Sequence, residues 1–376
     1  MGIQNLSSQP SGGRIVIYDS LRSAMIFLVI ILHVCMTYMA FPVSQWSFNS
    51  QDQSWIFTII VNLIDVFVIP VLFFISGYFT PSSYLKKGFH LFLKEKCFHI
   101  LFPWVIGILF VLPLVPLVLG NPLSYIFNLL KEDHLYFFHK QSHMWYLMIL
   151  FLFYFLYSLY AFFFHPVTKQ DPALYKKPLL FLIILIIVSA LFSYLGDKYI
   201  TPFSNWINIA HIIKIKPSKI IMHLSMFILG IYAWRQNWLK EGGWMPDIRF
   251  WRILAIGCIT LYMILRGYLP YYYSILRVPN VLFDSVCAFS ALIYALLIAI
   301  KIRKTRLSDF LVKSAPYSYG IYWIHIPLMF AYVSRIDTLD IPIWMKCISA
   351  IVVTSTASWL VCKYVLKKVP FLKKMF

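Results

Sequence analysis

The stretch from Leu21 to Phe41 is nearly all apolar, and it has about the 20 residues that a helix needs to cross a bilayer. Within it lies His33, and an ionisable side chain inside a membrane span is costly enough to indicate a functional site. Arg22 precedes His33 by eleven residues. Because eleven residues make almost three turns of about 3.6 residues each, both side chains leave the helix along one stripe, about 16 Å apart. The first helix therefore carries a cation near its start and an imidazole beyond the middle of the membrane.

Apolar segments of this length recur along the whole chain of 376 residues. Hydrophobic residues make up 61% of it and charged residues only 12%, whereas a soluble chain has about 25% charged residues. We predict an all-α polytopic membrane bundle with about ten transmembrane helices. The predicted spans are residues 20–41, 55–79, 99–119, 143–164, 178–195, 219–235, 251–269, 281–300, 316–334 and 342–364.

The net charge of +19 at pH 7 does not indicate a nucleic-acid partner, because the basic residues lie in loops between apolar runs. With the N-terminus in the cytosol, 23 of the 33 Lys and Arg residues lie at cytosolic ends of the spans and 10 at the opposite ends. The positive-inside rule then predicts that both termini are cytosolic. We expect a flexible cytosolic tail over residues 1–17, a membrane domain over 18–364 and a basic cytosolic tail over 365–376.

Four segments, in order along the chain, resemble those of a known family. They are Tyr18–Arg22 with His33, Leu72–Phe79, His143–Leu147 and Ser318–His325. They are similar to the opening Arg and His motif, the Phe-Phe-x-x-Ser-Gly segment, the His-x-Trp-Phe-Leu segment and the closing Ser-Tyr-Gly-x-Tyr-x-x-His segment of the acyltransferase 3 membrane family. The resemblance covers essentially the whole chain. After the first span, Trp46–Ser50 resembles one branch, the glucan biosynthesis protein C type, which attaches succinyl groups to periplasmic glucans.

This resemblance implies acyl transfer from a thioester donor to a hydroxyl group, by a multi-pass protein of the bacterial inner membrane. Acyl-CoA is then a substrate, no cofactor is permanently bound, and the acceptor is an extracytoplasmic carbohydrate. The acyl group expected from the branch is succinyl, with acetyl as the alternative. The residues fit this chemistry, since an alcohol needs a base to remove its proton and His is the commonest base. Burial disfavours imidazolium, so we expect His33 to be neutral and able to accept that proton.

Arg22 is about 16 Å from His33 along the helix axis, too far to take part in bond making. We expect it to hold a phosphate of the CoA donor at the cytosolic edge, with Asp19 fixing its guanidinium through an i,i+3 pair. The pantetheine arm would then follow the helix face to His33, through a cleft that reaches both compartments. Family members usually carry Arg-x-x-Arg before the third span, where this chain has Lys96 and His99. These two residues lack the forked geometry of Arg but stay candidates for donor binding.

The acceptor is expected to enter from the outer side. Candidate residues for the acceptor or its cavity are Asp65, Trp46, Asn49, His143, Trp145 and His325. Asp65 is costly in a span and should face the bundle or water, where it orients His33, binds the acceptor or is protonated. His325 either lines the cavity or orients its own helix, and His143 and Trp145 either contact a sugar or anchor the span. Packing is also an alternative for His33, and interface snorkelling for Arg22.

Other polar residues indicate structural roles. Ser76 and Gly77 are expected to allow close approach of helices, as small residues do in membranes. Arg266 and Asp284, near the outer ends of consecutive spans, are expected to form an ion pair. We expect no metal site, since His134, His139 and His143 are irregularly spaced and the six cysteines lack metal-ligand spacing.

Two other functional classes fit a polytopic bundle with buried charges. One is a transporter or flippase for a polysaccharide or lipid-linked sugar. Transporters often contain paired repeats with broken helices, and the sequence contains no such symmetry, which favours the enzyme. The other is a non-catalytic subunit of a glycan-assembly complex. Transfer of label from acyl-CoA to a glycan by the purified chain separates the enzyme from both.

Overall fold

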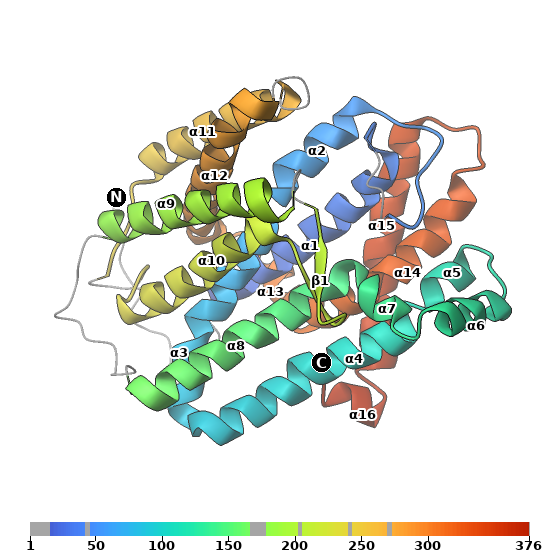
Figure 1. Cartoon of the computed structure of the whole chain (residues 1–376), viewed down its shortest axis with the longest axis horizontal. Helices are drawn as coiled ribbons and strands as arrows, with labels where there is room; N and C mark the ends of the chain where they lie inside the picture. The colour runs from blue at the N-terminus through green and yellow to red at the C-terminus, as the bar shows by residue number, and fades with distance from the viewer. Residues whose placement is uncertain are drawn as a thin grey trace.

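A computed structural model describes residues 16–41, 46–165, 178–201, 205–239, 243–268 and 273–375. Long helices form the bundle (Figure 1): α1 (Val16–Tyr38), α2 (Trp55–Asp65), α3 (Val68–Lys96), α8 (Trp145–Phe164), α9 (Leu179–Leu195), α10 (Pro217–Arg235), α11 (Ile248–Tyr268), α12 (Tyr273–Ile302), α14 (Ser318–Ile336) and α15 (Ile343–Val361). Shorter helices are α4 (Phe102–Ile106), α5 (Leu114–Val118), α6 (Leu123–Glu132), α7 (Tyr136–His139), α13 (Arg306–Ser314) and α16 (Pro370–Lys373). Strands β1 (Ile207–Ile209) and β2 (Ile213–Ile215) pair antiparallel, with Asn208 opposite Lys214.

Apolar length accounts for this architecture. Within the described residues, seven helical stretches are long and apolar enough to cross a membrane. One of them, residues 55–118, includes the predicted span 55–79 and all but the last residue of the predicted span 99–119. Helices α10 and α14, of 19 residues each, are also long enough but carry more polar side chains, such as His223 and His325. A helix overlaps each of the ten predicted spans, and the predicted all-α polytopic membrane bundle is confirmed.

Between the predicted spans 55–79 and 99–119 the chain is helical rather than a loop, but the helix is interrupted at Gly88 before it runs on to Lys96. The helix changes direction at Gly88, whose φ of 68° is a left-handed conformation that glycine adopts readily. An ion pair between Lys87 and Glu95 spans this bend. On the other side, only Val66 and Phe67 separate α2 from α3, so Asp65 lies at a break within one span.

Contacts at the helix ends show that α1 and α14 run in the same direction and that α15 runs opposite to both. The start of α1 meets the start of α14, where the Oγ atoms of Ser23 and Ser318 are 3.1 Å apart. The end of α1 meets the start of α15, where the sulfurs of Cys35 and Cys347 are 3.9 Å apart. The turn that follows α15 returns to the start of α14, since a Cβ at Gly320 would lie 2.3 Å from Cys362 Sγ. This alternation is what a chain crossing the membrane back and forth requires.

Helix α3 runs through the middle of the bundle (Figure 1) and lies almost against the backbone of α10. A Cβ atom at Gly77 would lie 2.0 Å from the carbonyl oxygen of Phe227, and one at Gly230 would lie 2.1 Å from that of Phe74. Without hydrophobic attraction between helices in lipid, such close contact is a main source of association. Ser76 is satisfied within its own helix, because its hydroxyl donates to the carbonyl of Leu72 at 2.9 Å.

The two long outer loops contact each other. The first contains α6 and α7. The second contains the β1–β2 hairpin, which was not predicted. His139 Nε2 lies 3.1 Å from His211 Nδ1, and the side chain of Gln141 donates to the carbonyl of Ile212. These contacts connect α7 to the hairpin over the outer end of the bundle.

Candidate active site

Three imidazoles from three separate helical segments meet at the outer half of α1. His33 Nδ1 lies 2.9 Å from His325 Nε2, and the two rings are stacked with centroids 5.1 Å apart. His143, in the turn before α8, lies edge-on to His325 at 4.8 Å and to His33 at 6.3 Å. His325 and His143 are buried, whereas His33 keeps an intermediate exposure. The sequence alone did not indicate that these rings touch.

Hydrogen bonding determines which nitrogen of each ring carries a proton. His325 Nδ1 is 2.7 Å from the carbonyl oxygen of Tyr322, and a carbonyl oxygen only accepts. His325 Nδ1 therefore carries the proton, and in the neutral ring Nε2 is an acceptor. That acceptor faces His33 Nδ1, so His33 donates from Nδ1 and keeps a lone pair on Nε2.

The second nitrogen of His33, Nε2, is not engaged by a neighbouring side chain among the described residues. It has no hydrogen-bond partner in this part of the chain, and it is not fully buried. His143 Nδ1, in contrast, is both unpaired among these residues and fully buried. On the far side of the ring, Trp46 stacks at 5.4 Å and donates from its indole to Thr37 Oγ1 at 3.2 Å. Asn49, from the same loop, is exposed. His33 thus lies between Trp46 and His325 with its Nε2 not hydrogen-bonded to any described residue.

Arg22 lies at the other end of the same stripe, because α1 is a continuous helix from Val16 to Tyr38. Its guanidinium pairs with Asp19 at 3.7 Å and lies 5.8 Å from the centre of the Phe79 ring. Its side chain is 39% exposed. The contact with Phe79 places the guanidinium of Arg22 beside α3.

Lys96 lies close to Tyr154 of α8, whereas His99 contacts the C-terminal segment. The ammonium of Lys96 is 4.4 Å from the centre of the Tyr154 ring. His99 Nδ1 is 3.3 Å from the carbonyl oxygen of Met375, and its own carbonyl accepts from the hydroxyl of Tyr319 at 2.9 Å. Lys96 and His99, the two expected donor-binding residues, thus contact different parts of the protein.

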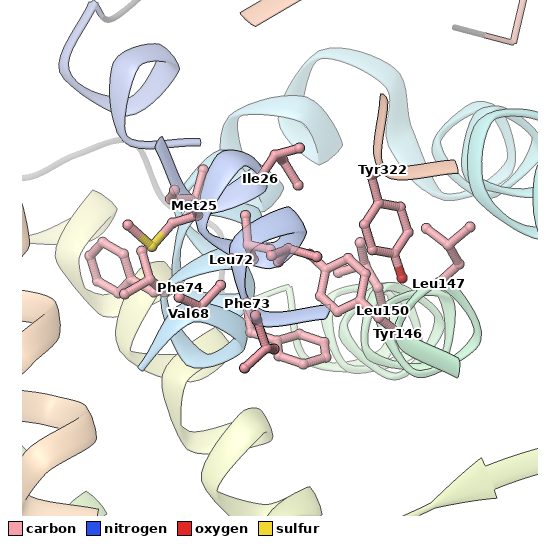
Figure 2. Close-up of a cluster of buried hydrophobic side chains, with 14 of the residues drawn as sticks. Met25, Ile26, Val68, Leu72, Phe73, Phe74, Tyr146, Leu147, Leu150 and Tyr322 are labelled. Carbon is pink, nitrogen blue, oxygen red and sulfur yellow. The ribbon is translucent and has the colours of Figure 1, made fainter. Parts of the chain in front are cut away.

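Between Arg22 and His33 the stripe is filled by side chains. Ile26 and Val29 occupy it with exposed fractions of 6% and 1%. Figure 2 shows Ile26 in a packed cluster with Tyr146 and Tyr322. The stripe faces the bundle, as expected, but the expected cleft open to both compartments is closed along this stretch.

The expected acceptor residues divide into two groups. Trp46, His143 and His325 surround His33, whereas Asp65 and Trp145 line a separate pocket of about 50 Å³ with Lys216. There the indole of Trp145 stacks on the ring of His223 at 5.6 Å. Asp65 does not orient His33 through Nδ1, because His33 Nδ1 is hydrogen-bonded to His325 Nε2.

Charged residues behind this second pocket are paired differently from the prediction. The ion-pair partner of Asp284 is Lys219, not Arg266, because α10 brings that lysine against α12. Arg266 stays within electrostatic range of Asp284. Outside the spans, burial beside the hairpin and the nearby charge of Lys140 lower the pKa of Lys214 to about 8. In the described part of the chain, no three His, Cys, Asp or Glu side chains are grouped to hold a metal ion.

Comparison with known protein families accounts for the motifs gathered here. A family model described as an acyltransferase domain matches residues 15–363, nearly the whole chain. The chain belongs to this acyltransferase family. It is a membrane acyltransferase, since the matched region is also the helical bundle. No curated protein and no solved structure matches it.

Some features of this acyltransferase were missed by sequence reasoning. The hydrogen bond from His325 to Tyr322 joins residues three apart in α14, a spacing that one helix turn permits. Lys216, Lys219 and Trp206 of the second pocket lie in or beside the outer hairpin. Lys216 and Lys219 lie on the predicted outer side, where the positive-inside rule expects few basic residues. That exception was the signal in the sequence that could have indicated the second pocket.

Proposed function

We propose that this acyltransferase moves a succinyl or acetyl group from cytosolic acyl-CoA to a hydroxyl of an extracytoplasmic glycan, with His33 as the general base. The observation that carries the proposal is the hydrogen-bonded series from His33 through His325 to the carbonyl of Tyr322. It leaves a lone pair on His33 Nε2, the atom that would take the proton of the acceptor hydroxyl. The localisation proposed with it is the bacterial inner membrane.

In this mechanism the acceptor oxygen attacks the thioester carbonyl while its proton passes to His33 Nε2. Collapse of the tetrahedral intermediate forms the ester and expels CoA thiolate, which takes up that proton. His325 accepts from His33 Nδ1–H throughout, and it is well placed to stabilise the imidazolium that forms. The unpaired Nδ1 of His143 is a further acceptor for a substrate hydroxyl or a water molecule.

Donor binding is proposed at the opposite end of α1. Arg22 lies beside Phe79 of α3 and Lys96 beside Tyr154 of α8, and together they offer two positive charges for CoA phosphates. The distance of about 16 Å from Arg22 to His33 is comparable to the length of a pantetheine arm. Because Ile26 and Val29 fill the intervening stripe, turnover by this route requires these side chains to move.

Acceptor binding is proposed at the outer end, where aromatic rings offer stacking surfaces for sugars. Trp46 covers His33, and Trp145 lies 5.0 Å from Trp206 at the second pocket. Asp65 and Lys216 of that pocket supply hydrogen-bonding groups. Family membership favours an enzyme over a transporter, so no transport function is proposed.

The test uses the purified chain in lipid nanodiscs with acyl-labelled succinyl-CoA or acetyl-CoA and an envelope glycan. Release of CoA thiol and transfer of label to the glycan are measured. His33→Ala is expected to lower kcat about 10²–10⁴-fold, the usual contribution of a general base. His134→Ala is the matched control, because that imidazole is exposed on the outer loop. Unchanged turnover by His33→Ala would contradict the proposal.

A further inference from the structure

A second face of α1 borders an apolar groove of about 340 Å³ that the proposed chemistry does not use. Its walls come from α1, α11 and α12, with Leu311 of α13 at one end. Ala291, Ala295 and Ala299 lie four residues apart on α12, so one face of that helix has only methyl side chains and leaves room beside it. The groove is lined almost entirely by carbon atoms.

The groove is separate from the proposed donor route. Leu21 and Leu28 are among the residues of α1 that line the groove. At about 100° per residue, these positions lie about 120° around the helix from the stripe of Arg22 and His33. A donor arm that follows the stripe therefore does not pass through the groove.

The groove ends among basic residues. Ile302, the last residue of α12, lines it between Lys301 and Arg303 in the sequence, and Arg306 begins the next helix. On α11, Arg252 precedes the lining residues by about one turn. These four cations form no ion pair with any residue in the described part of the chain.

Helix α13, which closes this end of the groove, has the pattern of an interfacial helix. Leu307 and Phe310 are exposed on one side, whereas Ser308 and Leu311 are buried on the other. Its single acidic residue is Asp309. By the positive-inside rule this end faces the cytosol, where lipid headgroups meet the basic residues.

We propose that the groove binds an acyl chain of an anionic phospholipid of the cytosolic leaflet, with the headgroup phosphate against Lys301, Arg303 and Arg252. Lipid tails are as apolar as the groove itself, so the fit of the acyl chain to the walls of the groove, and not polarity, favours its binding. Selection of an anionic over a zwitterionic lipid comes from the cations at the mouth.

The test measures which phospholipids stay bound to the purified chain. The protein is exchanged into mixed micelles with equal amounts of phosphatidylglycerol and phosphatidylcholine of identical acyl chains, and retained lipid is counted by native mass spectrometry. Phosphatidylglycerol is expected to be enriched about five-fold or more. The variant with Lys301→Gln and Arg303→Gln is expected to lose most of this enrichment. The variant with Lys373→Gln and Lys374→Gln is the control, because those exposed lysines lie in the C-terminal segment.

A second variant, Ala295→Trp, fills the groove and is expected to lower retention of both lipids while the KM for acyl-CoA stays unchanged. Equal retention of both lipids by the wild-type chain would overturn the proposal. Retention that is the same in the Lys301 and Arg303 variant as in the control would also overturn it. A raised KM for acyl-CoA in Ala295→Trp, with lipid retention intact, would assign the groove to the donor instead.

Discussion

The two nitrogens of the His33 imidazole have different surroundings. Nδ1 faces His325, whose own Nδ1 is committed to the Tyr322 carbonyl, and Nε2 has no hydrogen-bond partner among the described residues. The direction of this hydrogen bond fixes the tautomer of His33 without any carboxylate. In the membrane interior a neutral partner of this kind avoids the cost of a second buried charge.

His325 is therefore predicted to be a positioning residue for His33. Gln at this site carries an oxygen that accepts from His33 Nδ1, whereas Leu removes the acceptor. We expect His325→Leu to lower kcat about 100-fold or more and His325→Gln to stay within about ten-fold of wild type, with similar KM for acyl-CoA. Steady-state kinetics of CoA release measure both. If the two variants lose the same activity, His325 acts only in packing.

Arg22 is predicted to bind the donor rather than only to anchor α1 at the interface. Removing a charge-assisted phosphate contact costs about 1.5–3 kcal/mol, so Arg22→Ala should raise the KM for acyl-CoA about 10–100-fold. Arg235→Ala is the matched control, since Arg235 is an exposed arginine at the end of α10. Isothermal titration with a non-transferable CoA thioether gives the same comparison for binding. An unchanged KM in Arg22→Ala would leave interface snorkelling as its role.

At the scale of elements, α3 is the helix that holds the site together. It packs on α10 through glycine, brings Phe79 under Arg22 and carries Lys96 to Tyr154. Helix α2 ends at Asp65, before α3 begins, and Asp65 lines the second pocket. The stripe of α1 that carries Arg22 and His33 thus lies beside a helix whose close packing on α10 uses glycine rather than polar side chains.

The α3–α10 contact is predicted to tolerate no added methyl group. A Cβ at Gly230 would lie 2.1 Å from the carbonyl oxygen of Phe74, and backbone atoms cannot move aside cheaply. Gly230→Ala should therefore destabilise the fold by at least about 1–3 kcal/mol and lower the melting temperature in detergent. Gly257→Ala is the control, because no atom lies within 4 Å of its added Cβ. Equal melting temperatures for the two variants would show that the helices separate easily.

The whole molecule has its proposed donor and acceptor regions at opposite ends of one bundle. The start of α1 with Arg22 lies beside the starts of α13 and α14, and the outer half of α1 with His33 lies below the loop of Trp46. The outer loops meet over the end that carries the second pocket. Such a bundle suits a transfer between compartments only if the Arg22 end faces the cytosol.

That orientation is a prediction from the charge distribution. A reporter that fluoresces only in the cytosol, fused after Phe376, is expected to be active, and one that works only outside the cytosol is expected to be silent. A single cysteine placed at exposed Asn49 in a cysteine-free background should react with an impermeant maleimide from outside. Labelling at Lys304→Cys should need permeabilised cells. The reverse labelling pattern would invert the proposed direction of transfer.

The sequence by itself determined the class and the elements of this protein. Apolar runs of about 20 residues admit only helices in a bilayer, because every backbone group must be paired within the segment. The same periodicity placed Arg22 and His33 on one stripe of α1, which a regular helix guarantees. The ordered motifs indicated the family that matches residues 15–363.

Only the tertiary structure decided which side chains meet. Nothing local relates His33 to His325, which are 292 positions apart and touch because α1 and α14 are neighbours. Packing also assigned Asp284 to Lys219 and placed Asp65 in a separate pocket, since helix rotation and the break after α2 set those directions. A membrane span specifies its own length and periodicity, but its rotation depends on the small residues and close contacts of its neighbours, such as Gly77 against Phe227.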